Sequence, residues 1–143
     1  MARLDEALEL RRRLTLVSAK AGSGKTTAVS EWLHQQARPA AWLSLDASDD
    51  EPLRFLAYLV AALGTLEIEI GPVVLGQLEA ARPPRPDALV AELINDLAVH
   101  PTPFLFVLDD YHLIQDEWIH QAIGFLAEHQ PPGMHLVLIT RVD

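Results

Sequence analysis

One loop constrains this chain more than any other feature of its sequence. Residues 19–26 read Ala-Lys-Ala-Gly-Ser-Gly-Lys-Thr and lie between a short apolar run, 14–18, and a segment with helical character that extends to about Ala37. A glycine-rich loop between a strand and a helix lets successive backbone N–H groups point at one anion, and the helix adds the positive end of its dipole. This context predicts a phosphate-binding loop of the Walker A type; an ordinary glycine turn before a helix is the alternative.

Each residue of the loop has a role that follows from its chemistry. Gly22 and Gly24 permit the tight curl, Lys25 would reach the β- and γ-phosphates as a point charge, and the Thr26 hydroxyl would bind Mg²⁺. Ala19 stands where the strict pattern has glycine, at a position that makes the turn and accepts a small side chain. The residues predicted to hold the nucleotide are Ala21, Gly22, Ser23, Gly24, Lys25, Thr26 and Thr27, with Thr27 starting the helix proper.

The rest of the chain alternates apolar runs of strand length with segments of helical periodicity. Strands are expected at 14–18, 40–45, 104–108 and 135–140, and helices are expected to start near 27, 49–52, 73 (ending near 81), 87 and 118. Asp87 is the expected cap of its helix. This alternation predicts an α/β fold with a mostly parallel sheet of about four strands covered by helices. The strand at 104–108 is apolar throughout, so it is expected at the centre of the sheet.

Two aspartates follow that central strand directly. Asp109 is the predicted Mg²⁺-side carboxylate, and Asp110 is the predicted general base for an attacking water, together the pattern of a Walker B element. Taken alone, paired aspartates after a strand more often form a turn or a helix cap. The phosphate loop earlier in the chain is what favours the metal-binding interpretation.

Thr140 and Arg141 end the fourth expected strand. The carboxyl ends of parallel strands meet at one edge of the sheet, where open sheets of this kind bind ligands. Arg141 is therefore predicted to sense a γ-phosphate there, and a charged strand terminus without a role is the alternative.

Composition excludes several classes of function. The chain has no cysteine, so disulfides, zinc–thiolate sites and thiol nucleophiles are ruled out, and its six histidines lack the spacing of a zinc site. No apolar stretch reaches the ~18 residues of a membrane span and the first residues lack a signal-peptide pattern, so a cytoplasmic location is expected. Residues 39–143 carry four Lys/Arg and sixteen Asp/Glu, and a segment this acidic is not expected to bind nucleic acid directly.

Five segments of the sequence together resemble one family. The segments are 14–27, 41–46, 54–59, 107–114 and 136–141, and the tryptophan strand at 41–46 and Asp-Asp-Tyr-His-Leu-Ile at 109–114 are the more selective. In this order they resemble the signal-transduction ATPases with numerous domains (STAND), in particular the large MalT-like, LuxR-type transcriptional regulators.

The resemblance implies a three-layer P-loop NTPase core with strand order 1-4-3-2. It also implies a nucleotide switch that uses ATP or ADP with Mg²⁺, in which ATP binding with an inducer favours self-association and slow hydrolysis resets the inactive form. By position, Lys25 and Thr26 match the phosphate and Mg²⁺ residues, Asp109 the metal aspartate, Asp110 the catalytic acid and Arg141 the sensor. Proline is usual in the family where Lys20 stands.

Relatives of this kind continue with a fifth strand, further helical domains and a DNA-binding helix-turn-helix, which are absent from this sequence. Residues 1–143 are therefore expected to form a single core from a larger regulator. The first strand, normally covered by the fifth, is expected as an exposed edge open to self-association.

Two other functions remain open. A small-molecule or nucleotide kinase uses the same loop but needs a lid with arginines, for which 64–86 offers Arg82 and Arg85. A nucleotide-binding scaffold without turnover is the second alternative to a slow ATPase.

Overall fold

The computed structural model describes residues 14–19, 25–36, 38–79, 82, 84–100 and 102–141. Its strands are β1 (Leu14–Ala19), β2 (Ala40–Ser44), β3 (Phe104–Asp109) and β4 (Met134–Arg141). Its α-helices are α2 (Lys25–His34), α3 (Pro52–Gly64), α4 (Pro72–Gln77), α5 (Pro86–Ala98) and α6 (Glu117–Glu128), and two short 3₁₀ helices are η1 (Ala47–Asp49) and η2 (Tyr111–Leu113).

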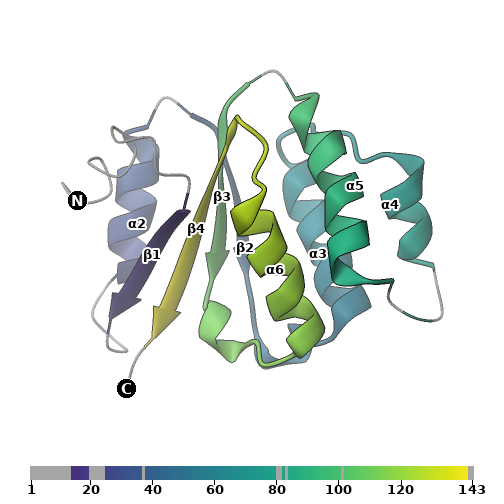
Figure 1. Ribbon diagram of the computed structural model, residues 1–143. Helices are drawn as coiled ribbons and strands as arrows, with labels where there is room; N and C mark the ends of the chain where they lie inside the picture. The colour runs from purple at the N-terminus through teal and green to yellow at the C-terminus, as the bar shows by residue number, and fades with distance from the viewer. Residues whose placement is uncertain are drawn as a thin grey trace.

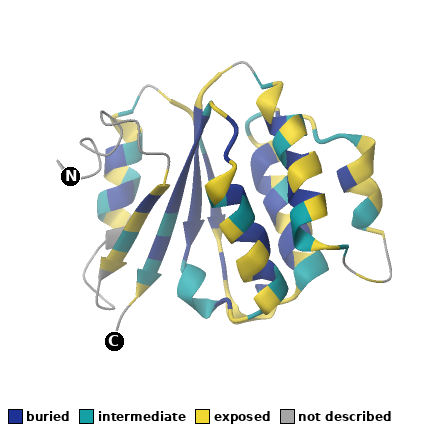
Figure 2. Cartoon of the chain, in the orientation of Figure 1, coloured by how far each residue is buried: buried dark blue, intermediate teal, exposed yellow. Residues whose placement is uncertain are grey.

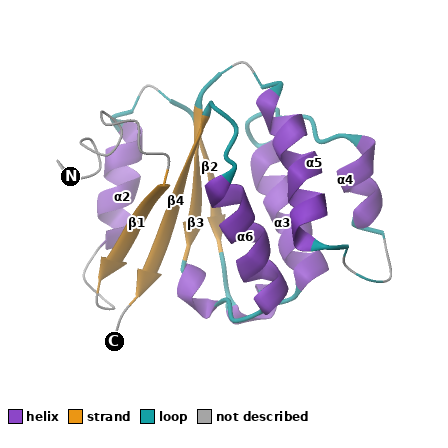
Figure 3. Ribbon diagram, viewed as in Figure 1, coloured by secondary structure: helices purple, strands orange, loops and turns teal. Residues whose placement is uncertain are grey.

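The described strands form one parallel sheet in the order β1-β4-β3-β2, which confirms the predicted order (Figures 1 and 3). Every residue of β3 is buried, because it pairs with β2 on one side and β4 on the other. Its central position therefore agrees with its uninterrupted apolar sequence.

Helices cover both faces of the sheet, giving three layers (Figure 1). On one face α2 places the fully buried Val29 and Trp32 against Leu105 and Val107 of β3 and their neighbours Val137 and Ile139. On the other face α3 and α6 pack against the even-numbered residues of β3, with α5 and α4 outside them. Figure 2 shows the buried residues following the sheet and the inward sides of these helices.

Helix boundaries differ from the predictions at the start of α5 and at the ends of α2 and α4. Asp87 is not the cap of α5, because Pro86 takes the first helical position and Arg85 the cap, which leaves Asp87 in the first turn. The helix expected to reach Ala37 ends at His34, where the N–H of Gln35 bonds to a carbonyl three residues back. For the same reason α4 ends at Gln77, before the predicted end near 81.

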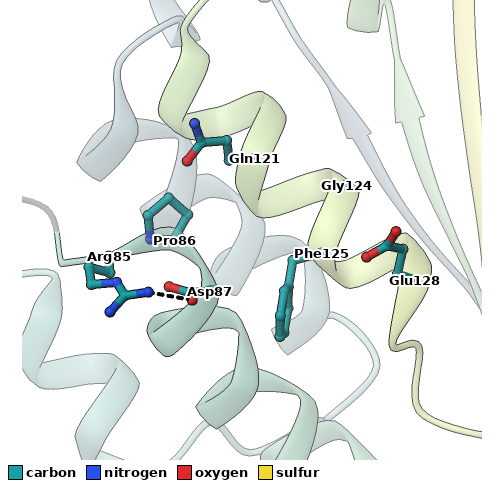
Figure 4. A pocket seen from close by; sticks show the side chains of 7 residues that line it. All are labelled: Arg85, Pro86, Asp87, Gln121, Gly124, Phe125 and Glu128. Atoms are coloured by element: carbon teal, nitrogen blue, oxygen red, sulfur yellow. Dashed lines mark hydrogen bonds and ion pairs between the residues drawn. The ribbon is translucent and has the colours of Figure 1, made fainter.

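A hollow of about 580 Å³ lies between α5 and α6 (Figure 4). Arg85 and Asp87 form an ion pair of 2.8 Å at its rim, Phe125 projects towards it, and Gly124 contributes no side chain. Its lining residues lie on α5, on α6 and just before α5. None of them belongs to a strand or to the residues that directly follow β1, β2 or β3, so the hollow is separate from the predicted site.

Among the described helices none has the length and apolar character to cross a membrane.

The strand β1 is the exposed edge that the sequence predicts. Among the described strands it pairs with β4 alone, and its Leu14 and Leu16 are 38% and 68% exposed. By their pairing with Leu136 and Leu138, both leucines stand on the face that α3 and α6 cover elsewhere in the sheet.

Among the described helices α2 alone packs on its face of the sheet, and its largest fully buried side chain there is Trp32. We therefore expect Trp32→Ala to lower the free energy of unfolding by about 3–5 kcal/mol. Trp42→Ala is the control, with an expected loss of about 1–2 kcal/mol, because Trp42 lies half-buried on the edge strand β2. Urea denaturation followed by circular dichroism measures both. Equal losses in the two variants would contradict this account of the α2 face.

Candidate functional site

The parallel sheet brings the predicted site residues to one edge. Ala19, the last residue of β1, pairs with Arg141 at the end of β4, and Asp109 at the end of β3 pairs with Ser44 at the end of β2. The helix α2 starts at Lys25, just after the loop that leaves β1, so its amino end faces the same edge. The carboxyl ends of β1 and β3 thus lie at the same edge of the sheet, on either side of β4, as a joint phosphate and metal site requires.

The phosphate loop itself lies outside the described residues. This applies to Ala21, Gly22, Ser23 and Gly24, and also to the side chains of Lys25 and Thr26. The backbone of Lys25, Thr26 and Thr27 forms the first turn of α2, so the helix begins before the predicted Thr27. The ligand roles of these residues stay predictions from the sequence.

Asp109 is a buried carboxylate on the face that α2 covers. Side chains alternate along a strand, and Leu105 and Val107 pack against α2, so Asp109, two residues further, points to the same face. Its side chain is nearly inaccessible to solvent, with 6% of the residue exposed, and its carbonyl accepts a hydrogen bond of 3.0 Å from the N–H of Leu45. A carboxylate is an oxygen ligand of the type that Mg²⁺ prefers, so Asp109 fits the predicted role at the metal.

Asp110 adopts a left-handed backbone conformation, with φ of 60° and ψ of 36°. Aspartate tolerates this region better than most residues, and here it turns the chain sharply from β3 into η2. The turn brings the carboxylate of Asp110 to 3.3 Å from Nε of Arg141. Because the Arg141 side chain is 48% exposed, this ion pair contributes little to stability, and its importance lies in the geometry.

His112 is a residue of this edge that the sequence interpretation missed. Its Nδ1 accepts a hydrogen bond of 3.2 Å from the backbone N–H of Arg141, so η2 is tied to the end of β4. The signal in the sequence was its position two residues after Asp110 in a polar segment, but histidine spacing was judged only against zinc sites. Among the described residues, no group of three or more potential ligand side chains is placed to hold a metal.

Tyr111 lies between Asp110 and His112 and is largely withdrawn from solvent. Burial, and secondarily the negative charge of Asp50, raise the pKa of Tyr111 to about 12. Its hydroxyl lies 2.8 Å from Nδ1 of His120 on α6. The phenol therefore stays protonated at physiological pH and can donate to the ring nitrogen.

Together, the sheet order, the helices on both faces and the acidic end of β3 beside the start of α2 define an ATPase domain of the P-loop class. The chain belongs to the AAA ATPase domain family, whose model matches residues 1–139. The resemblance to the ATPase domain of MalT-like regulators is also confirmed.

Three relatives illustrate that likeness, each named HTH-type transcriptional regulator MalT. The chain is 37% identical over 131 residues to the protein of Cronobacter sakazakii, 38% over 133 to that of Yersinia enterocolitica and 40% over 131 to that of Serratia proteamaculans. Each match covers 90% of this chain and 14% of the relative. The chain therefore spans about a seventh of the length of these curated relatives.

We expect the phenol of Tyr111 to ionise at a higher pH than a free tyrosine. Absorbance at 295 nm should show Tyr111 ionising near pH 12, and Tyr111→Phe should remove that step. The folded-state pKa of Tyr111 lies above the unfolded value, so the stability that it contributes is complete below about pH 10 and is lost as pH rises towards 12. Ionisation of Tyr111 near pH 10 in the folded protein would contradict its burial.

Proposed function

We propose that this chain is the nucleotide switch of a signal-responsive transcriptional regulator, binding ATP or ADP with Mg²⁺ and hydrolysing ATP slowly. The observation that supports it most is that the carboxyl ends of β1 and β3 lie at one edge of the sheet, with Asp109 on the face covered by α2. Had the loop and Asp109 been at opposite ends of the sheet, no single nucleotide–metal complex would reach both.

In this proposal, binding and metal coordination are divided between two strand ends. Backbone amides of residues 21–27 and the Lys25 ammonium hold the phosphates, since a helix amino terminus and a lysine both favour anions. Thr26 and Asp109 hold Mg²⁺, which neutralises phosphate charge when bound. Mg²⁺ usually keeps several waters, so two protein ligands are sufficient.

Hydrolysis is assigned to the residues around η2. Asp110 accepts a proton from the attacking water, and Arg141 stabilises negative charge on the phosphoryl oxygens together with Lys25. The 3.3 Å contact between Asp110 and Arg141 supports their acting on one substrate.

The regulatory role rests on the likeness to the MalT proteins, which are named as transcriptional regulators. We propose a cytoplasmic location, which the same likeness supports. We propose no direct contact with nucleic acid by this segment, because residues 39–143 are strongly acidic.

Calorimetric titration with ATP, ADP and GTP, with Mg²⁺ or with EDTA, tests the binding. Lys25→Ala should weaken ATP affinity roughly 10- to 100-fold, the value of a lost charge-assisted hydrogen bond. Arg38→Ala removes the same charge from an exposed position beyond α2 and should have little effect. Equal affinity in wild type and Lys25→Ala would mean that the loop does not bind phosphate.

We also propose that two copies associate through the exposed edge of β1. Within the described sheet the outer edge of this strand has no partner strand, and it carries the exposed Leu14 and Leu16, so it is a template for pairing with another strand.

Leu16→Lys should shift the chain towards the monomer in light scattering at high concentration, because a charge on an edge strand opposes pairing. Val99→Lys is the matched control, since Val99 is 81% exposed and lies at the end of α5. A strictly monomeric wild type at high concentration would end this part of the proposal.

A further inference from the structure

One carboxylate joins two segments that leave neighbouring strands at the candidate site. Oδ1 of Asp50, in the segment after β2, accepts hydrogen bonds from the backbone N–H groups of Gln115 (3.0 Å) and Asp116 (2.8 Å), in the segment after β3. These two acceptor contacts connect residues 65 and 66 positions apart in the chain.

The other carboxylates of the segment after β2 serve that segment itself. Asp46 and Asp49 form a reciprocal capping box around η1, and Asp49 also pairs with Arg54 at 3.5 Å. Glu51 caps α3 by accepting from the N–H groups of Leu53 (3.2 Å) and Arg54 (2.8 Å). Asp50 thus stands on a segment whose conformation is already fixed by its neighbours, and it alone of these four is shown reaching the segment after β3.

The segment that receives these bonds, residues 110–116, carries Asp110, which is assigned to hydrolysis. It starts at Asp110, which pairs with Arg141 at 3.3 Å, and continues through His112, which accepts from the N–H of Arg141. It ends at Asp116, which caps α6. The segment is therefore tied to β4 near its start and to the segment after β2 near its end.

We propose that Asp50 is a positioning residue that sets Asp110 in place for hydrolysis and keeps His112 against the end of β4, an inference that rests on the proposed function. It acts through the backbone of Gln115 and Asp116. The expected consequence of its loss is a lower rate of hydrolysis at unchanged nucleotide affinity.

The exposure of Gln115 and Asp116 distinguishes a positioning role of Asp50 from a role in stabilising the fold. Gln115 is exposed and Asp116 is partly exposed, so water can replace Asp50 as the partner of both N–H groups. The fold then survives its removal, but the segment loses the fixed acceptor that holds its position. A displacement of about 1 Å at a catalytic group can cost roughly 100-fold in rate.

Steady-state ATPase kinetics on the full chain tests the role. Asp50→Ala should lower kcat by roughly 10- to 100-fold with ATP affinity within about threefold of wild type. Asp50→Asn should restore turnover, because its amide oxygen can accept the same two hydrogen bonds. Glu51→Ala is the matched control, since it removes a neighbouring carboxylate that also accepts two backbone N–H groups but leaves the segment after β3 untouched.

NMR of the nucleotide-free chain gives a readout that needs no turnover. Asp50→Ala should shift the backbone amide resonance of Arg141 and the ring nitrogens of His112, whereas Asp50→Asn and Glu51→Ala should leave them near their wild-type values. The proposal is overturned if Asp50→Ala and Glu51→Ala give the same spectra, or the same kcat where the wild type turns over. It is also overturned if Asp50→Asn lowers kcat, or shifts these resonances, as much as Asp50→Ala does. A wild type that binds no ATP in calorimetry refutes the proposed function separately, and the spectra still decide the position of η2.

Discussion

Parallel pairing of β3 between β2 and β4 is the constraint on which the rest of the structure depends. A strand buried on both faces cannot carry polar side chains along its length without leaving them unsatisfied, so its polar chemistry is confined to its end. Asp109 is the last residue of β3, and parallel register places it level with Ser44 and close to the ends of β1 and β4. The same pairing that forms the core therefore assembles the candidate site.

Part of the acidity of the chain has a structural role at the same edge. Several of its carboxylates accept backbone N–H groups where strands give way to helices, as Asp46, Glu51 and Asp116 do for η1, α3 and α6. A negative charge at the amino end of a helix is favourable because it meets unpaired N–H groups and the positive end of the dipole. These carboxylates therefore fix the loops that surround the candidate site.

The sequence predicted those features that depend on periodicity and on strand-to-helix context. The central place of β3 is confirmed, because an apolar run without alternation is a consequence of burial on both faces. The strand order and the exposed edge of β1, which the family resemblance implied, also agree with the described sheet. The contacts of His112 and Asp50 were not predicted, because they depend on the left-handed turn at Asp110 and on loops brought together across neighbouring strands. The predicted cap of α5, Asp87, was wrong by two residues, because Pro86 takes the first helical position and leaves Arg85 as the cap.

The arrangement of the helices bears on the choice between a switch and a kinase. A kinase needs arginines on a lid that closes over the transferred phosphate. Arg85, one of the two candidates from the sequence, is held by Asp87 at 2.8 Å beside the hollow between α5 and α6, and α4 packs against α5 in the outermost layer. Arg141, in contrast, lies at the carboxyl edge of the sheet in contact with Asp110. A cation fixed to the end of a strand can respond to the presence of a phosphate but cannot close over an acceptor, which favours the switch.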